Sequence, residues 1–302
     1  MADPSPSRPD VLCLGAVLWD LIGRSPLAMA PGADVPGRIV RVPGGVAMNI
    51  ALTLRRCGLA PTLLTAIGRD ADGDELIAAC ARLGIEAGHA FRSAELPTDR
   101  YLAIEDARGL VAAVADAHSL EAAGERILAP LADGRLGSAT QPWSGLIALD
   151  GNLTTALLAE IARSPLFAAA DLRVAPASPG KAKRIRPLLN HPRATLYVNL
   201  EEAGLLCDTR FDDAPAAARG LLQSGATRVL VTAGDRVCCD GKAGADLVTG
   251  VPAKVTVRRV TGAGDAFMAA HLVAERRGAD RAAALAAALH AASAHVAGET
   301  GS

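Results

Sequence analysis

The sequence alternates short apolar runs with stretches of helical spacing, and this alternation limits the fold more than any other feature. Residues 11–16 and 61–67 are short apolar runs, and residues 228–232 are rich in β-branched side chains. Between them, residues 47–57 carry apolar side chains at helical spacing. Strands that alternate with helices predict an α/β fold whose mainly parallel sheet is covered on both faces.

The remaining segments continue this pattern. We expect further strands and helices in the order strand 39–42, helix 72–83, strand 146–149, helix 154–164, strand 172–175, helix 181–189, strand 195–198, helix 201–207, helix 264–277 and helix 281–296. Two pairs of short apolar runs joined by polar, glycine-containing turns predict β-hairpins, at 101–114 and 237–248.

Composition excludes several functional classes. The chain has 31 Lys and Arg against 32 Asp and Glu, so it lacks the basic excess that holds nucleic-acid polymers or anionic membranes. Its six cysteines form no C-x-x-C pair and its six histidines no H-E-x-x-H motif, which argues against a zinc site or a disulfide framework. Without a signal peptide or an apolar stretch of membrane-spanning length, we expect a cytoplasmic protein, disordered over residues 1–10.

The most informative segment is residues 260–267, which read V-T-G-A-G-D-A-F. At a helix start, Gly262, Ala263 and Gly264 offer backbone N–H groups that an anion can approach closely. Asp265 follows directly, and a carboxylate beside a bound phosphate suits a general base that deprotonates the attacking hydroxyl. The structural alternative is a capped helix in which the acid only favours the helix dipole.

Other phosphate and nucleophile motifs are missing. Ala175 and Ala182 stand where a Walker loop around Gly180 and Lys181 needs its first glycine and its hydroxyl residue. The sequence has no G-x-S-x-G elbow, and no G-x-G-x-x-G fingerprint follows the first strand.

A second glycine turn lies near the amino end of the chain. Gly44 and Gly45 precede a helix that carries Asn49 in its first turns. An amide there can bind a polyol, and Asp20, beyond the carboxyl end of the first strand, can accept hydrogen bonds from two neighbouring hydroxyls. These residues predict a sugar site, although glycine turns with a nearby asparagine also occur without a ligand.

Together, the two segments resemble the signatures of the PfkB, or ribokinase-like, family of carbohydrate and nucleoside kinases. Gly44, Gly45, Asn49 and Ala51 match the amino-terminal signature, and residues 261–267 match the T-G-A-G-D-A-F signature without a gap. The resemblance implies a single kinase domain over residues 11–300, with a three-layer α/β/α core. It also implies a small β lid formed by about residues 17–43 and 97–116.

The resemblance further implies roles for individual residues, with ATP and Mg²⁺ as phosphoryl donor and metal ion. Asp265 would take the proton from the acceptor hydroxyl, and the N–H groups of Gly262, Ala263 and Gly264 would hold the transferring phosphoryl group. The other implied positions are Asp20, Gly44, Gly45, Asn49 and Tyr101 for the sugar or nucleoside, Asn199, Thr232, Gly234, Thr261 and His290 for ATP, and Glu202 for the metal.

Two positions depart from the family pattern. Val237 replaces the last glycine of the nucleotide segment, and Arg259 replaces an acid that stands two residues before Thr261 in many members. The second change puts in doubt a monovalent-cation site built around that acid. Neither position is in the base or the anion hole, so we expect catalysis to be retained.

The acceptor is less constrained than the reaction. Residues 101–104, 113–116 and 150–153 resemble the branch of the family that phosphorylates pseudouridine, which makes its 5′-hydroxyl the leading candidate. A free sugar such as ribose or fructose, another nucleoside, and a non-catalytic sugar- or nucleoside-binding sensor stay open. Aromatic residues make up only 3% of the chain, so Tyr101 and His290 are the candidate neighbours of a nucleobase. The exposed edges and apolar face of a small lid predict a homodimer formed through it.

Overall fold

The computed structural model describes residues 9–258 and 260–299. Residues 1–8, which belong to the segment expected to be disordered, and Arg259, with its expected effect on a cation site, lie outside the described residues. Asp10 is held by Ala60: its N–H donates to the Ala60 carbonyl at 3.0 Å, and its carboxylate accepts from the Ala60 N–H at 2.9 Å.

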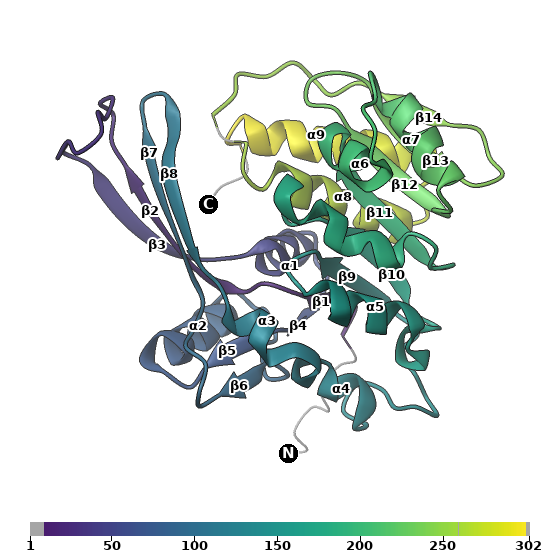
Figure 1. The fold of residues 1–302 in the computed structure, drawn as a ribbon, viewed down its shortest axis with the longest axis horizontal. Coiled ribbons are helices and arrows are strands. Elements are labelled where there is room, and N and C mark those ends of the chain that lie inside the picture. Colours follow the sequence, from purple (N-terminus) through teal and green to yellow (C-terminus); the bar gives the residue numbers. More distant parts are fainter. Residues whose placement is uncertain (1–8, 259, 300–302) are drawn as a thin grey trace.

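The core is an eight-stranded sheet with helices on both faces, which confirms the predicted fold class (Figure 1). Six neighbouring strands are parallel, and two antiparallel strands complete one edge. The order is β14 (Val248–Gly250), β13 (Cys238–Lys242), β12 (Arg228–Thr232), β11 (Ala194–Asn199), β10 (Asp171–Ala175), β9 (Leu146–Asp150), β1 (Val11–Leu14) and β4 (Pro61–Leu64).

Each face of the sheet supports its own buried cluster. In β1, Leu12 and Leu14 point to one cluster and Val11 and Cys13 to the other, because successive strand residues alternate sides. The second cluster is covered by α1 (Val46–Arg56), α2 (Ala71–Arg82), α8 (Ala263–Arg276) and α9 (Arg281–Val296). The first is covered by α3 (Ser119–Ala123), η1 (Gly124–Leu128), α4 (Ala129–Ala132), α5 (Thr155–Arg163), η2 (Pro165–Phe167), η3 (Pro179–Leu188), α6 (Leu200–Cys207) and α7 (Ala214–Gln223).

Several elements differ from those expected. The segment predicted as a helix at 181–189 is the 3₁₀ helix η3, which contains Pro187, a residue without the N–H that an α-helix needs. The run expected as one strand at 61–67 is divided between β4 and a strand at 66–68 of another sheet. The elements that were not predicted are strand β2 (Leu18–Arg24), a strand at 91–93, α3, η1, α4, η2 and α7. Both expected hairpins are present, as β7 (Arg100–Asp106) with β8 (Gly109–Asp116) and as β13 with β14.

A separate four-stranded sheet, in the order β3 (Arg38–Gly44), β2, β7 and β8, stands away from the core (Figure 1). Strands β2 and β7 are parallel, so two segments far apart in sequence form one sheet. A small sheet of β5 (Ala66–Gly68) and β6 (Phe91–Ser93) lies near its base. We refer to the four-stranded sheet as the lid sheet.

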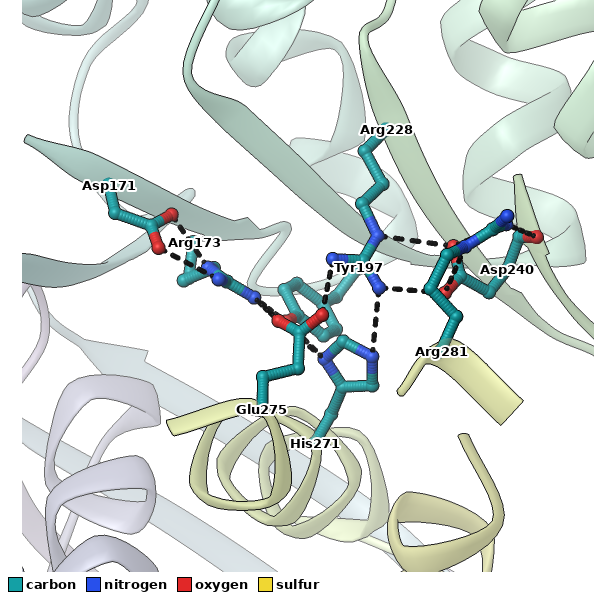
Figure 2. A network of polar contacts seen from close by, with 8 residues as sticks. All are labelled: Asp171, Arg173, Tyr197, Arg228, Asp240, His271, Glu275 and Arg281. Atoms are coloured by element: carbon teal, nitrogen blue, oxygen red, sulfur yellow. Dashed lines mark hydrogen bonds and ion pairs between the residues drawn. The ribbon is translucent and has the colours of Figure 1, made fainter. Parts of the chain in front are cut away.

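A network of charged side chains joins α8 to the core sheet (Figure 2). Glu275, on the last turns of α8, forms ion pairs with Arg173 of β10 and Arg228 of β12. His271, one turn earlier, bonds the Tyr197 hydroxyl at 2.9 Å, and burial lowers its pKa to about 4, so it is neutral at pH 7. The network also contains Asp171, Asp240 and Arg281. It therefore fixes the helix that carries Asp265 in its first turn.

Candidate active site

The carboxyl ends of the parallel strands bring most of the predicted residues to one edge of the core sheet. Strand β1 ends just before Gly15, β9 ends at Asp150, and β11 and β12 end at the register partners Asn199 and Thr232. In open α/β sheets this edge is where ligands bind, because the strand ends and the helix starts meet there.

Asp265 and Asn49 meet although they are far apart in sequence. Each lies in the first turn of its helix, and α1 packs against α8. The Asn49 Nδ2 group donates to Asp265 Oδ2 at 3.0 Å. Burial, together with the negative charges of Asp150 and Glu202, raises the pKa of Asp265 to about 7, against the opposing effect of the Asn49 hydrogen bond. A carboxyl with this pKa can accept and release a proton near neutral pH.

The backbone before Asp265 leaves amide hydrogens available. Gly262, the N-cap of α8, has φ +86°, which glycine adopts without the strain of a side chain. The Ala263 N–H donates to the Val260 carbonyl at 3.1 Å, whereas no acceptor among the described residues takes the N–H groups of Gly262, Gly264 and Asp265. A Cβ added at Gly264 would meet nothing within 4 Å, so an anion has room to approach.

Asp20 lies on strand β2 of the lid sheet, next to the turn formed by Gly44 and Gly45. A Cβ at Gly44 would stand 1.9 Å from Asp20 Oδ2, and one at Gly45 would stand 2.4 Å from the Ala16 carbonyl oxygen. Both positions therefore require glycine. Burial raises the pKa of Asp20 to about 6. Tyr101 is the register partner of Asp20 across β2 and β7, and burial together with the Asp20 charge raises the pKa of its hydroxyl.

Asp150 joins these parts of the site and was not among the candidate residues. Its fully buried carboxylate accepts from the N–H of Ala16 at 2.8 Å, of Ala47 at 3.1 Å and of Asn152 at 2.8 Å. The same carboxylate leaves no room at Gly15 for a Cβ, which would be 2.2 Å from Oδ2. Burial raises its pKa, and the amide donors oppose that shift. An acid at the end of a predicted strand was the signal that could have found it.

Asn199 and Glu202 cap the start of α6 reciprocally. Asn199 Oδ1 accepts from the Glu202 N–H and Glu202 Oε2 accepts from the Asn199 N–H, each at 2.8 Å. Burial raises the pKa of Glu202 to about 7, and the neighbouring Glu201 charge adds to the shift. A cavity of about 840 Å³ opens beside them, lined in part by Thr232 and Gly234.

The two remaining nucleotide candidates, His290 and Thr261, are not among the residues that line this cavity. His290 is exposed on α9 and forms no hydrogen bond with any residue that the structure describes. The carbonyl oxygen of Thr261 lies 2.8 Å from Nε2 of His295, a residue that sequence reasoning did not single out. The assigned roles of all these residues stay predictions.

The chain matches the model of the pfkB family carbohydrate kinases over residues 8–301. It therefore belongs to this family and is a phosphotransferase with an alcohol group as acceptor. Among curated proteins it is similar to the pseudouridine kinase of Escherichia coli, at 32% identity over 269 residues, which cover 86% of this chain and 81% of that protein.

Solved structures share the fold over nearly the whole chain. A carbohydrate kinase from Agrobacterium tumefaciens is 27% identical with a TM-score of 0.77, covering 93% of this chain and 89% of its own. A ribokinase from Arabidopsis thaliana, complexed with ribose and ATP, is 17% identical with a TM-score of 0.76, covering 95% of this chain and 92% of its own. Within residues 9–258 and 260–299, no helix is both long and apolar enough to cross a membrane.

Proposed function

We propose that this kinase transfers the γ-phosphoryl group of ATP to a primary hydroxyl of a ribosyl compound, with the 5′-hydroxyl of pseudouridine as the leading acceptor. The observation that carries the proposal is the hydrogen bond between Asn49 and Asp265, which joins an acceptor-binding amide to a carboxyl of pKa about 7. The similarity to the pseudouridine kinase of Escherichia coli supports this acceptor, and the likeness to a ribokinase keeps ribose as the second candidate.

In this mechanism, Asp265 takes the proton of the acceptor hydroxyl as its oxygen attacks the γ-phosphorus. The new oxygen–phosphorus bond forms while the bond to the leaving oxygen of ADP breaks. The N–H groups of Gly262 and Gly264 hold the oxygens on which charge accumulates, and Ala263 contributes only if its bond to Val260 opens. Asp20 and Asn49 bind the hydroxyls that orient the acceptor, with Tyr101 beside them.

On the nucleotide side, Glu202 is the carboxylate that we assign to Mg²⁺. Glu202 uses Oε2 to cap Asn199, and its Oε1 accepts no hydrogen bond from a described residue. The described residues contain no group of three or more His, Cys, Asp or Glu side chains able to hold a metal ion. One carboxylate nevertheless fits Mg²⁺, which keeps several waters and is otherwise bound by substrate phosphates. When bound, the ion supplies positive charge to those phosphates.

Release of ADP with a panel of acceptors tests the proposal. Pseudouridine, uridine, ribose and fructose are each mixed with ATP, Mg²⁺ and the enzyme, and we expect the highest kcat/KM with pseudouridine. Asp265→Asn should lower kcat by at least about 10²-fold, since general-base catalysis contributes that much, while acceptor binding is retained. Glu160→Gln, which alters an exposed acid on α5, is the matched control.

Each outcome decides between the alternatives. A preference for ribose or fructose would replace pseudouridine by a sugar acceptor, and binding without ADP release from any acceptor would favour a sensor. Full kcat in the Asp265→Asn variant would overturn the assignment of the base.

We further propose a homodimer formed through the lid sheet. By the strand register, Ile39, Leu102 and Val114 lie on the face of the lid sheet opposite Asp20 and Tyr101. These side chains are 76%, 40% and 63% exposed, and a second copy would remove their apolar surface from water.

We also propose that the enzyme acts in the cytoplasm. The use of ATP and the six free cysteines support this location, because thiols stay reduced there. Fractionation of the source cells tests it, and recovery of the protein outside the cytoplasmic fraction would contradict it.

A further inference from the structure

The last turn of α9 touches the loop that precedes Asp265. His295 Nε2 lies 2.8 Å from the Thr261 carbonyl oxygen. A carbonyl oxygen only accepts, so Nε2 carries a proton and donates it. The imidazole also lies against the next residue, because a Cβ at Gly262 would stand 3.1 Å from both Cε1 and Nε2 of His295.

Two further hydrogen bonds join α9 to the segment that leads into this loop. The Arg258 N–H donates to the Val296 carbonyl at 2.9 Å, and the Ser293 hydroxyl donates to the Ala253 carbonyl at 3.5 Å. The described residues between β14 and Thr261 form no helix or strand, and Val251, Val257 and Val260 are 64%, 65% and 69% exposed. With so little burial of its own, the segment depends on α9 for its position.

Peptide geometry turns this contact into a constraint on the anion hole. The Thr261 C=O and the Gly262 N–H belong to one planar trans peptide unit, in which they point in opposite directions. A donor that holds the carbonyl on the α9 side therefore aims the Gly262 N–H away from α9. That N–H has no acceptor among the described residues.

We propose that His295 is a positioning residue for phosphoryl transfer: by donating to the Thr261 carbonyl, it fixes the direction in which the Gly262 N–H meets the transferring phosphoryl group. The inference rests on the proposed role of Gly262 in holding that group. His295 does not touch the reacting atoms and acts through the Thr261–Gly262 peptide unit. Its contribution belongs to the charge that develops in the transition state and not to binding of the acceptor.

Two variants separate the hydrogen bond from the bulk of the side chain. His295→Leu removes the donor and keeps an apolar side chain, whereas His295→Gln keeps an N–H donor at a similar reach. We expect His295→Leu to lower kcat by roughly ten- to a hundredfold, below the loss for an entire oxyanion-hole donor. The KM for the acceptor should stay within about twofold, and His295→Gln should restore kcat to within about threefold of wild type.

A binding measurement supplies a readout that is independent of turnover. ADP with aluminium fluoride mimics the transferring phosphoryl group, so its affinity should fall in His295→Leu by about the same factor as kcat, whereas the affinity for ADP alone should not change. His295→Gln should bind both like the wild type. Thermal unfolding of all three proteins identifies a variant that has simply lost its fold.

The outcomes distinguish this inference from the proposed function. Unchanged kcat and fluoride affinity in His295→Leu, or an equal loss in His295→Leu and His295→Gln, would overturn the positioning role. If the wild type phosphorylates none of the acceptors, the proposed function fails, and the affinity ratio between ADP–aluminium fluoride and ADP still tests His295.

Discussion

The carboxyl group of Asp265 lies where burial and the charges of Asp150 and Glu202 disfavour its ionised form. The pKa of Asp265 is raised to about 7, that of Glu202 also to about 7, and that of Asp20 to about 6. Each of these groups is partly protonated near neutral pH, and the charge of Glu202 raises the pKa of Asp265. As a base, Asp265 must be ionised, so kcat/KM should rise as the pH increases through about 7.

Ionisation of Asp265 should therefore lower the stability of the folded protein. Its folded-state pKa lies above the unfolded value, so folding takes up a proton between about pH 4 and pH 7, and this group alone destabilises the protein as the pH rises through that window. Asp265→Asn removes the charge, and its side-chain oxygen can still accept from Asn49. We expect the variant to melt at a higher temperature than the wild type at pH 8.

The difference between the two proteins should shrink as the pH falls from 7 toward 4. Calorimetric melting curves of both at pH 8, 6 and 4 check this. A constant difference across the three pH values would show that the pKa of Asp265 is not raised in the folded protein.

Most residues of the candidate site could be predicted from the sequence, but the contacts between them could not. The signature at 261–267 identified Asp265, and the glycine turn before α1 identified Gly44 and Gly45. Their meeting with Asn49 and Asp20 depends on packing between distant helices and on strand register. His295 carries no local motif and Asp150 only its place after a predicted strand, because each contacts a backbone group from another part of the chain.

Helix α8 joins the candidate base to the charged network, and its position depends on Glu275. That carboxylate bridges Arg173 and Arg228, whose side chains are only 9% and 13% exposed (Figure 2). Glu275→Gln removes the carboxylate that the two arginines share, while Asp171 stays paired with Arg173 and Asp240 with Arg228, so we expect a loss of about 1.5–3 kcal/mol in the free energy of unfolding. Urea denaturation measures it.

Asp171→Asn is the matched control, since Asp171 also pairs with Arg173 but is 36% exposed. Its loss should stay below about 1 kcal/mol, because water screens a partly exposed pair. Equal losses in the two variants would show that the network does not depend on the bridge made by Glu275.

The elements show where local pattern was sufficient and where it was not. The core strands and α8 and α9 carry their own periodicity and were predicted. Strand β2 was missed because its residues follow β1 almost at once and include Asp20 and Gly23, so only pairing with β3 and β7 defines it. Helix α7 has local signals in the N-cap Asp213 and in Pro215, and its buried stripe was missed because three of its four residues are alanines: Ala214, Ala217, Ala218 and Leu221.

For the whole molecule, the lid sheet presents apolar side chains on the face away from the predicted acceptor residues, which is the basis for the proposed dimer. Val114→Asp should shift the protein from dimer to monomer in sedimentation velocity at micromolar concentration, because a charge on an apolar interface is costly to bury.

Val251→Asp alters an equally exposed valine, at 64%, outside the lid sheet, and should leave the dimer intact. A wild type that sediments as a monomer, or a Val114→Asp variant that stays dimeric, would rule out assembly through this face.

The pairing of α1 with α8 also has a consequence for synthesis on the ribosome. The proposed acceptor residues Asp20 and Asn49 leave the exit tunnel early, whereas Asp265 and α9, which contacts Thr261, follow only after the core strands. A nascent chain that stops short of α9 lacks the contacts that we propose to orient the N–H groups before Asp265. With the roles proposed for Gly262 and His295, phosphoryl transfer therefore requires α9 to have docked against the loop before Asp265.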